Sequence, residues 1–380
     1  MPPTARRWST ATCARPPISM SACRCGARQS NVMRRSWRRG HGSIAIISAA
    51  IFASLTCRCR WASDRCGCSP RPYCPNFTRC HHAMISPEAK KLFEYLRSVD
   101  TLPSGTFEEQ RAGFDASIAK VPSAGGVAIE PASGPGFAGA WFRPDDAREA
   151  VVLLYLHGGG FVVGSTVSHR PILTNLASAS GVDILALDYR MAPEHVYPAA
   201  VDDAMAAYRW LLGEGYAGHR IAVAGDSAGA NLALSLMLRA RDEGLPLPGC
   251  AVTISGWLDL RVTSDSITRN ASTDPMMTGD MIRPMAELYA GDIALDDPRV
   301  SPALALDLSG LPPIYLQTST ADILEDDSHL LAARATAAGV DVTIDSWPGM
   351  IHVWHAFAHI IPEARDAFGK IAAFLNARLR

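Results

Sequence analysis

The sequence contains no uninterrupted apolar run of about 18 residues, the minimum for a helix that spans a bilayer. We therefore expect no stable membrane insertion, and the 48% of residues that are hydrophobic are available for a buried core. Lysine is absent from residues 1–83, where Asp64 is the single acidic residue beside 14 arginines. The formal charge is thus +13 over residues 1–83 and −14 over 84–380. An acidic main part of the chain argues against nucleic acid as a partner.

Cysteine is nearly absent after residue 83, where only Cys250 occurs, whereas nine cysteines precede that point. Nine is an odd number, and the close pairs are spaced Cys-x-Cys rather than Cys-x-x-Cys, so neither a disulfide framework nor a zinc site is indicated. A metal-dependent hydrolase that uses Cys80, His81 and His82 likewise has no supporting ligand spacing. We expect no metal ion and no other cofactor.

Residues 1–83 show no hydrophobic periodicity from which a core could be built. We expect them to be a non-native or disordered extension of the reading frame, with the natural start at Met84. One alternative is a secretory signal or lipoprotein anchor over residues 33–57, where a basic stretch precedes an apolar one; another is a Cys-rich module. The first interpretation predicts a cytoplasmic protein, and the signal interpretation predicts an exported one.

After Met84 the chain alternates between apolar runs of strand length and amphipathic stretches of helix length. Buried strands are predicted at 151–156, 183–187, 221–224, 250–254, 314–317 and 342–344, and helices at 172–180, 199–213, 228–243, 325–338 and 362–379. Continuous apolar runs are typical of strands that are covered on both faces. The alternation predicts an α/β fold with a mostly parallel central sheet and helices on both faces.

Two segments stand outside this alternation and are predicted to form a helical cap. In the first, a capping box from Thr106 to Glu109 begins a helix whose buried side includes Phe114 and Ile118. The second interrupts the alternation between two strands and is rich in methionine. The predicted division is a cap over 84–130, a core part over 131–260, a cap insertion over 261–300 and a second core part over 301–380.

The pentapeptide GDSAG at residues 225–229 joins a predicted strand to a predicted helix. In this context the pattern G-x-S-x-G is typical of a nucleophile elbow, in which the glycines let strand and helix approach closely and leave the serine hydroxyl exposed. Ser227 is therefore predicted to be a catalytic nucleophile; the alternative is a turn serine without chemistry. The adjacent Asp226 points away from it by strand geometry and is predicted to be a hydrogen-bonding brace.

Three consecutive glycines follow the predicted strand at 151–156. Backbone N–H groups in such a loop can point into a cavity and stabilise a tetrahedral oxyanion. The candidates for this oxyanion hole are Gly158, Gly159, Gly160 and, directly after the predicted nucleophile, Ala228. His157 precedes the serine in the chain and is predicted to brace the loop through hydrogen bonds.

A site with this nucleophile has the chain order serine, acid, histidine. His352 lies in the loop after the last predicted strand and is the candidate base, whereas His355 and His359 are expected to have no catalytic role. Asp322 is the first carboxylate after the strand at 314–317 and is the candidate acid that holds the histidine in the correct tautomer. The acidic residues behind it fit the first turn of the next helix, where the helix dipole favours negative charge. These are Glu325, Asp326 and Asp327.

Several motifs occur in order: HGGGF at 157–161, YRMAPEH at 189–195, GDSAG at 225–229, WLDL at 257–260 and SGLPP at 309–313, followed by Asp322 and His352. Together they resemble the bacterial hormone-sensitive-lipase-like esterases of the α/β-hydrolase superfamily, over about residues 84–380. The resemblance implies an α/β-hydrolase fold and a cofactor-free carboxylic ester hydrolase that acts on short to medium acyl chains under a helical cap. It also implies that Gly159 and Gly160 supply the hole while Gly158 shapes the turn, and that YRMAPEH is structural.

Side chains of the cap and of the loops beside the serine are predicted to line an acyl pocket, with core packing as the alternative for the methionines. The candidates are Phe161, Trp257, Met276 and Met277. The same three catalytic residues also fit a lactone, carbamate or amide hydrolase, because they do not select the leaving group. A non-catalytic small-molecule receptor is a third interpretation, which the presence of His352 disfavours. We expect a small-molecule ester as substrate, and a monomer or a homodimer.

Overall fold

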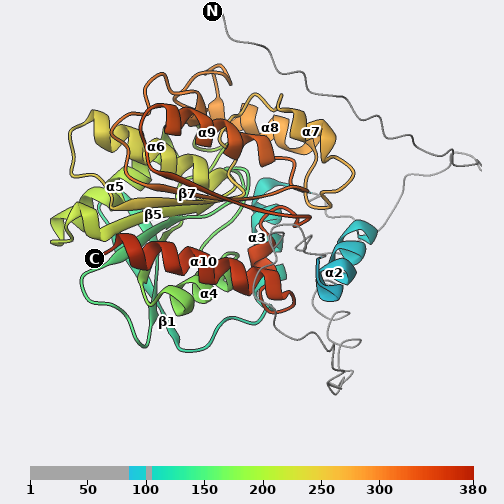
Figure 1. The fold of residues 1–380 in the computed structure, drawn as a ribbon, viewed down its shortest axis with the longest axis horizontal. Helices are drawn as coiled ribbons and strands as arrows, with labels where there is room; N and C mark the ends of the chain where they lie inside the picture. Colours follow the sequence, from blue (N-terminus) through green and yellow to red (C-terminus); the bar gives the residue numbers. More distant parts are fainter. Residues whose placement is uncertain (1–84, 100–104) are drawn as a thin grey trace, which may run out of the picture. The chain divides into compact units, whose positions relative to one another are not determined.

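The computed structural model describes residues 85–99 and 105–380, so the predictions for 1–83 and for a start at Met84 lie outside the described residues. This part of the chain contains an eight-stranded sheet (Figure 1). Its strands are β1 (Val127–Gly134), β2 (Phe137–Pro144), β3 (Val152–Leu156), β4 (Asp183–Leu187), β5 (Ile221–Asp226), β6 (Cys250–Ile254), β7 (Ile314–Ser319) and β8 (Val342–Trp347). Their spatial order is β1-β2-β4-β3-β5-β6-β7-β8. The β1–β2 and β2–β4 pairs are antiparallel, and the pairs from β4 to β8 are parallel.

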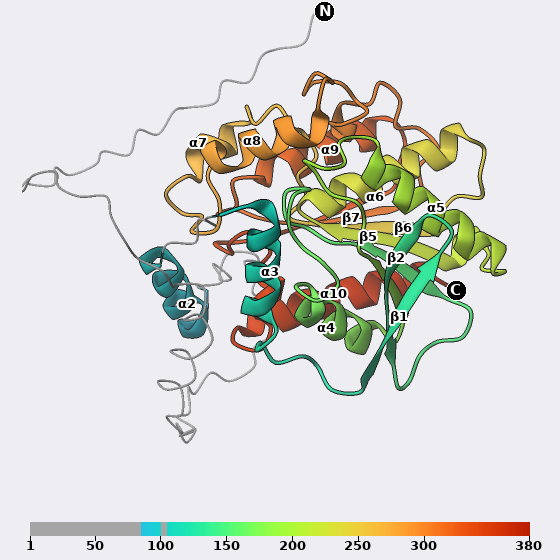
Figure 2. The same cartoon turned by 180° about the vertical axis from the view of Figure 1, so that it is seen from behind.

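Helices cover both faces of this sheet, as predicted. They are α2 (Pro87–Ser98), α3 (Phe107–Ile118), α4 (Arg170–Ser180), α5 (Ala199–Gly213), α6 (Ala228–Asp242), α7 (Asp265–Arg269), α8 (Gly279–Ala290), α9 (Glu325–Ala337) and α10 (Pro362–Arg378). Figures 1 and 2 show α4 and α10 on one face and α5, α6 and α9 on the other. No helix among the described residues is both long and apolar enough to cross a membrane.

Strand β3 shows how the two cores are built. Val152, Leu154 and Leu156 pack into the core that includes side chains of α5, α6 and α9, whereas Leu153 and Tyr155 pack into the core that includes those of α4 and α10. All five side chains are fully buried. Successive side chains of a strand point to opposite faces, so a continuous apolar run supplies both cores at once. The prediction of a strand covered on both faces is confirmed here.

Four details differ from the sequence-based predictions. Strand β8 was expected to be buried, but it is the last strand of the described sheet, and Ile344 is 39% exposed. Phe114 and Ile118 are only half-buried, because α3 lies at the surface and has no fully buried residue. The five-residue α7 was not predicted, since it is too short to show helical periodicity. The predicted cap boundary at residue 130 falls inside β1.

The two segments predicted to form a cap are in contact. Helix α2 buries Leu92 and Phe93 in the core that contains α10, and its Arg97 Nη2 donates to the carbonyl oxygen of Thr273 in the segment between β6 and β7 (3.0 Å). Helices α7 and α8 belong to that same segment. The capping box of α3 is present, with Thr106 and Glu109 each accepting the other's backbone N–H. The division into cap and core segments remains a prediction.

The junction between β5 and α6 depends on two glycines. A Cβ atom on Gly229 would lie 1.9 Å from the carbonyl oxygen of Leu156, and one on Gly225 would lie 2.3 Å from the carbonyl carbon of Gly229. Both distances are far shorter than van der Waals contact. Only glycine lets the first turn of α6 lie directly against the end of β3, and this contact fixes where α6 begins.

We expect Gly229→Ala to destabilise the fold, because overpacking in a tight core costs about 1–3 kcal/mol or more. Urea unfolding followed by circular dichroism measures the change. The matched control is Gly369→Ala in the interior of α10, where a Cβ would meet no atom within 4 Å. That control should stabilise the protein by about 0.5–1 kcal/mol through helix propensity. Equal unfolding midpoints for the two variants would contradict the packing argument.

Candidate active site

The predicted nucleophile lies at the carboxyl end of β5. Ser227 is the N-cap residue of α6, with φ 51° and ψ −120°. A positive φ is uncommon for a residue with a side chain and persists only where the surroundings hold it. Two hydrogen bonds to the end of β6 and the segment after it do so: the Ser227 N–H donates to the Ile254 carbonyl (2.9 Å), and the Trp257 N–H donates to the Ser227 carbonyl (3.0 Å). The strand, sharp turn and helix match the geometry of a nucleophile elbow.

The candidate base and acid are hydrogen-bonded to each other. His352 Nδ1 donates to Asp322 Oδ2 at 3.0 Å. Asp322 is fully buried after β7, and its Oδ1 accepts the N–H of Leu324 (2.9 Å). The loop of His352 is held by the next residue, since the Val353 N–H donates to Ser255 Oγ (3.1 Å). A proton on Nδ1 leaves Nε2 of the neutral ring as an acceptor, which a general base requires.

Burial and the neighbouring charges shift the pKa values of His352 and Asp322 in opposite directions. Burial lowers the pKa of His352, but the carboxylates of Asp322, Asp274 and Asp226 outweigh it, so the pKa lies above the ordinary 6.5. Burial raises the pKa of Asp322, but its contacts with His352 and Leu324 outweigh it, so the pKa lies below the ordinary 3.8. Asp322 is therefore ionised at neutral pH, and His352 is a stronger base than a free imidazole.

Ser227 and His352 follow β5 and β8, which belong to the parallel part of the sheet, and so lie at the same sheet edge. Each keeps a small accessible fraction, 5% for Ser227 and 6% for His352. The hydrogen bonds within the described ranges do not include one between Ser227 Oγ and His352 Nε2, so this contact remains a prediction. His355 Nε2 is instead bonded to Gln317 Oε1 (2.6 Å), and burial lowers the pKa of His355 to about 3. His355 thus has a structural partner away from the serine.

The glycine loop requires a correction to the predicted oxyanion hole. The Gly158 N–H lies 3.1 Å from Asp226 Oδ1, to which it donates, so it is not free to bind an oxyanion. Gly159 and Gly160 have φ of 110° and 63°, which a residue with a Cβ rarely adopts. The described residues supply no acceptor for the N–H groups of these two glycines. Gly159, Gly160 and Ala228 thus remain the predicted donors, with Gly158 shaping the turn.

Asp226 is the brace predicted from its place beside the serine. It accepts hydrogen bonds from Tyr155 Oη (2.7 Å) and the Gly158 N–H, and it pairs with His169 Nε2 (3.3 Å). Burial raises the pKa of Asp226, but His169 and Tyr155 outweigh it and bring the pKa to about 2. His157 is structural, as predicted: burial lowers its pKa to about 3, and its ring stacks on Tyr189 (4.2 Å). Sequence reasoning missed His169, because no motif of the chain marks it.

The predicted pocket residues are placed differently from one another. Phe161 and Trp257 are almost fully buried, and Phe161 stacks on Tyr289 of α8 with ring centroids 3.7 Å apart. Phe161 thus packs the glycine loop against α8, and Trp257 lies beside Phe161, with ring centroids 5.7 Å apart. That these two side chains line an acyl pocket remains a prediction. Met276 and Met277 are half-buried and contact different cores. Another methionine of the methionine-rich segment 261–300, which was not among these four candidates, lies beside the predicted oxyanion hole.

Met285 of α8 is that side chain. A Cβ built on Gly160 would lie 2.5 Å from Met285 Sδ, so this sulfur lies directly beside a predicted oxyanion donor. Met285 is half-buried and lies one helical turn before Tyr289, which stacks on Phe161. The four-residue spacing of these two side chains on α8 was the available sequence signal.

Helix α3 is fastened over the same loop by one arginine. Arg111 Nε donates to the Val162 carbonyl and Nη2 to the Ala192 carbonyl, both at 2.8 Å. The guanidinium also forms a two-pronged ion pair with Glu194, at 3.1 and 2.7 Å. Glu194 belongs to the YRMAPEH motif, which was predicted to be structural. Helix α3, the segment directly after the glycine loop and this motif are thus held together.

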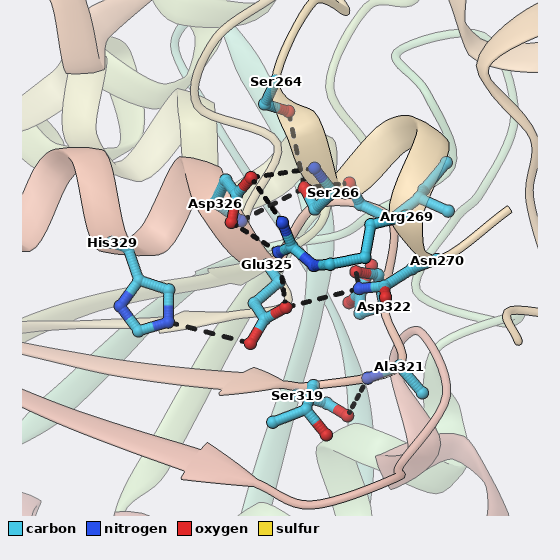
Figure 3. Close-up of polar contacts among 12 residues, drawn as sticks. Ser264, Ser266, Arg269, Asn270, Ser319, Ala321, Asp322, Glu325, Asp326 and His329 are labelled. Atoms are coloured by element: carbon cyan, nitrogen blue, oxygen red, sulfur yellow. Dashed lines mark hydrogen bonds and ion pairs between the residues drawn. The ribbon is translucent and has the colours of Figure 1, made fainter.

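The acidic residues behind Asp322 lie in the first turn of α9, as predicted. Arg269 of α7 pairs with Glu325 (2.9 Å) and Asp326 (2.7 Å), as Figure 3 shows. His329 of α9 lies beside Glu325 on the other side (3.8 Å). Nowhere in residues 85–99 and 105–380 could three or more His, Cys, Asp or Glu side chains together hold a metal ion. This cluster therefore docks α7 onto α9.

Known proteins are similar to this chain in sequence and fold. A family model described as the alpha/beta hydrolase fold matches residues 153–356. An acetyl-hydrolase of Streptomyces hygroscopicus is 38% identical over 293 residues, which are 77% of this chain and 97% of that protein. A carboxylesterase of Mycobacterium tuberculosis, NlhH, is 36% identical over 60% of this chain and 74% of its own length.

Solved structures of bacterial esterases are also similar to this chain. The crystal structure of an esterase from the bacterial hormone-sensitive lipase family is 39% identical, with a TM-score of 0.75, over 78% of this chain and 99% of that one. Crystals of the esterase EstE5 soaked with p-nitrophenyl butyrate gave a structure with 39% identity and a TM-score of 0.74, over 77% of this chain and 99% of that one. The chain belongs to the alpha/beta hydrolase fold family, among the bacterial hormone-sensitive-lipase-like esterases.

The raised pKa of His352 predicts how activity depends on pH. A general base must be neutral, so kcat/KM should fall as the pH drops through a value above 6.5. Asp322→Asn removes the carboxylate that raises this pKa while burial still lowers it, so the acid limb should move to lower pH. The rate should also fall on the order of 10⁴-fold, because the imidazole loses its orienting anion.

The measurement is kcat/KM for a p-nitrophenyl ester from about pH 5 to 9, a range that covers the titration of a histidine. The released carboxylic acid is quantified by chromatography, because the absorbance of the other product, p-nitrophenol, itself depends on pH. An acid limb that stays in place in Asp322→Asn would contradict the assignment of Asp322.

Proposed function

We propose that this esterase cleaves carboxylic esters through an acyl-enzyme on Ser227. As Ser227 Oγ bonds to the ester carbonyl carbon, His352 Nε2 takes the hydroxyl proton. His352 then passes that proton to the leaving alkoxide as the bond between carbonyl carbon and alcohol oxygen breaks. Water attacks the acyl-enzyme, gives a proton to His352, and releases the carboxylic acid as that proton returns to Ser227.

The observation that carries this proposal is the hydrogen bond between His352 Nδ1 and Asp322 Oδ2 at the sheet edge where Ser227 occupies its strained turn. The ionised Asp322 stabilises the imidazolium that forms when the serine proton is taken. The order of the strands that carry the three residues supports their approach.

We assign stabilisation of the oxyanion to the N–H groups of Gly159, Gly160 and Ala228. Ala228 is the first residue of α6, so its N–H has no partner within the helix and lies at the positive end of the helix dipole. Each donor of this kind is worth roughly 10² to 10³ in kcat.

The substrate class that we propose is esters of short to medium acyl chains. The half-buried Met277, Met281 and Met285 contact the core beneath α8, and Met285 stands beside Gly160. Flexible thioethers can adapt to unbranched acyl chains. The soaking of p-nitrophenyl butyrate into crystals of the relative EstE5 points to the same size. A cytoplasmic location and the oligomeric state stay predictions.

Ser227→Ala should abolish hydrolysis of p-nitrophenyl butyrate, with kcat lower on the order of 10⁶-fold, because no other group supplies the attacking oxygen. Steady-state kinetics measures the loss, and thermal unfolding shows whether the fold is kept. The matched control is Ser235→Ala, two turns further along α6, whose hydroxyl makes a long 3.4 Å hydrogen bond to Asn231. It should keep wild-type turnover.

The same wild-type assay with a laurate ester tests the acyl class. Undiminished turnover in Ser227→Ala would overturn the mechanism, whereas a kcat/KM for laurate above that for butyrate would overturn only the acyl class.

A further inference from the structure

The segment between β6 and α8 holds the turn that carries the triad acid. Ser266 Oγ donates to the Ile323 carbonyl (2.7 Å), and Asn270 Nδ2 donates to the Asp322 carbonyl (2.7 Å). The Ile323 N–H in turn donates to Asp274 Oδ2 (3.2 Å). Figure 3 shows Ser266 and Asn270 reaching this turn from α7 and the residue after it. Three side chains of the predicted cap insertion therefore fix the backbone at and directly after Asp322.

Asp274 differs from the other two side chains because it is a carboxylate. It is buried, and its Oδ1 accepts the N–H of Met276 (2.9 Å), so both its oxygens are bonded to backbone groups. Within the described residues, no arginine or lysine forms an ion pair with Asp274. Burial and the charge of Asp322 together raise the pKa of Asp274 to about 7, against the opposing effect of His352.

His352 thus faces more negative charge than Asp322, its hydrogen-bonded partner, supplies. Asp322 from the turn after β7, Asp274 from the insertion and Asp226 from β5 all act on it, and His355 of the segment Trp354–Phe357 is the basic group beside it. Burial keeps His355 neutral, with a pKa of about 3, so it does not offset these carboxylates. Of the two carboxylates beyond the triad, Asp226 is committed to His169, whereas Asp274 is not paired with a base.

We propose that Asp274 is a positioning residue that holds the turn of Asp322 and, through its charge, makes His352 a stronger base. This inference rests on the proposed roles of Ser227, Asp322 and His352. A neutral side chain with an acceptor oxygen, such as the amide of asparagine, would suffice to accept the Ile323 N–H. A buried carboxylate without a basic partner is costly, and what it adds is an electric field on the imidazole.

The test compares Asp274→Asn with Asn270→Ala. Both variants disturb the same turn, but only the first removes a charge. We expect Asp274→Asn to move the acid limb of kcat/KM to lower pH by about 0.5 to 1 pH unit. Asn270→Ala should lower kcat with the limb in its wild-type place. Asp280→Asn removes an exposed charge from the same segment and should change neither kcat nor the limb.

An acid limb of Asp274→Asn that coincides with those of wild type and Asn270→Ala would overturn the proposal. Ser227→Ala tests the roles of Ser227, Asp322 and His352 separately. Coinciding acid limbs would therefore leave the proposed function standing, whereas activity in Ser227→Ala would remove the basis of the proposed function and of the role of Asp274.

If Asp274→Asn fails to fold, the shape of the acid limb of kcat/KM in the wild-type protein tests the proposal instead. Protonation of Asp274 weakens the binding of a proton to His352, so the two titrations oppose each other and the limb should be broader than a one-proton curve. A one-proton limb at or below pH 6.5 would also overturn the proposal.

Discussion

The strained backbone of Ser227 is the constraint on which the rest of the site depends. Its φ of 51° is held from two sides, by hydrogen bonds to the end of β6 and the segment after it, and by the close approach of α6 to β3 that Gly229 permits. The same approach brings the N-terminus of α6 to the sheet edge and leaves the Ala228 N–H without a helical partner. One turn thereby places together Ser227, the proposed nucleophile, and Ala228, a proposed oxyanion donor.

Two buried His–Asp pairs flank this turn and serve different ends. Asp226 and His169 (3.3 Å) lie beneath the glycine loop, where Asp226 also accepts the Gly158 N–H and so fixes the start of the loop. Asp322 and His352 (3.0 Å) form the pair in which, in the proposed mechanism, the carboxylate orients the general base. In both pairs burial opposes ionisation and the partner restores it, since the pKa of each histidine is raised and that of each aspartate is lowered.

Sequence reasoning succeeded where a local pattern carries the information. The apolar run of β3, the glycines around Ser227 and the first carboxylate after β7 each follow from short-range chemistry, and the structure places them as predicted. It failed where partners lie far apart in the chain. The exposure of β8 depends on its place in the sheet order, and the loss of Gly158 as an oxyanion donor depends on Asp226, 68 residues away. Asp274 acts on Asp322 from another segment, with no spacing rule to mark it.

The most direct test of the account is covalent labelling of the nucleophile. Phenylmethylsulfonyl fluoride transfers its sulfonyl group to a serine oxygen activated by a neighbouring base, and peptide mass spectrometry locates the adduct. The account predicts one adduct per chain, on Ser227, with loss of esterase activity in proportion to labelling. It also predicts that labelling slows as His352 becomes protonated. An adduct on another residue that accompanies the loss of activity, or full activity in chains labelled at Ser227, would contradict it.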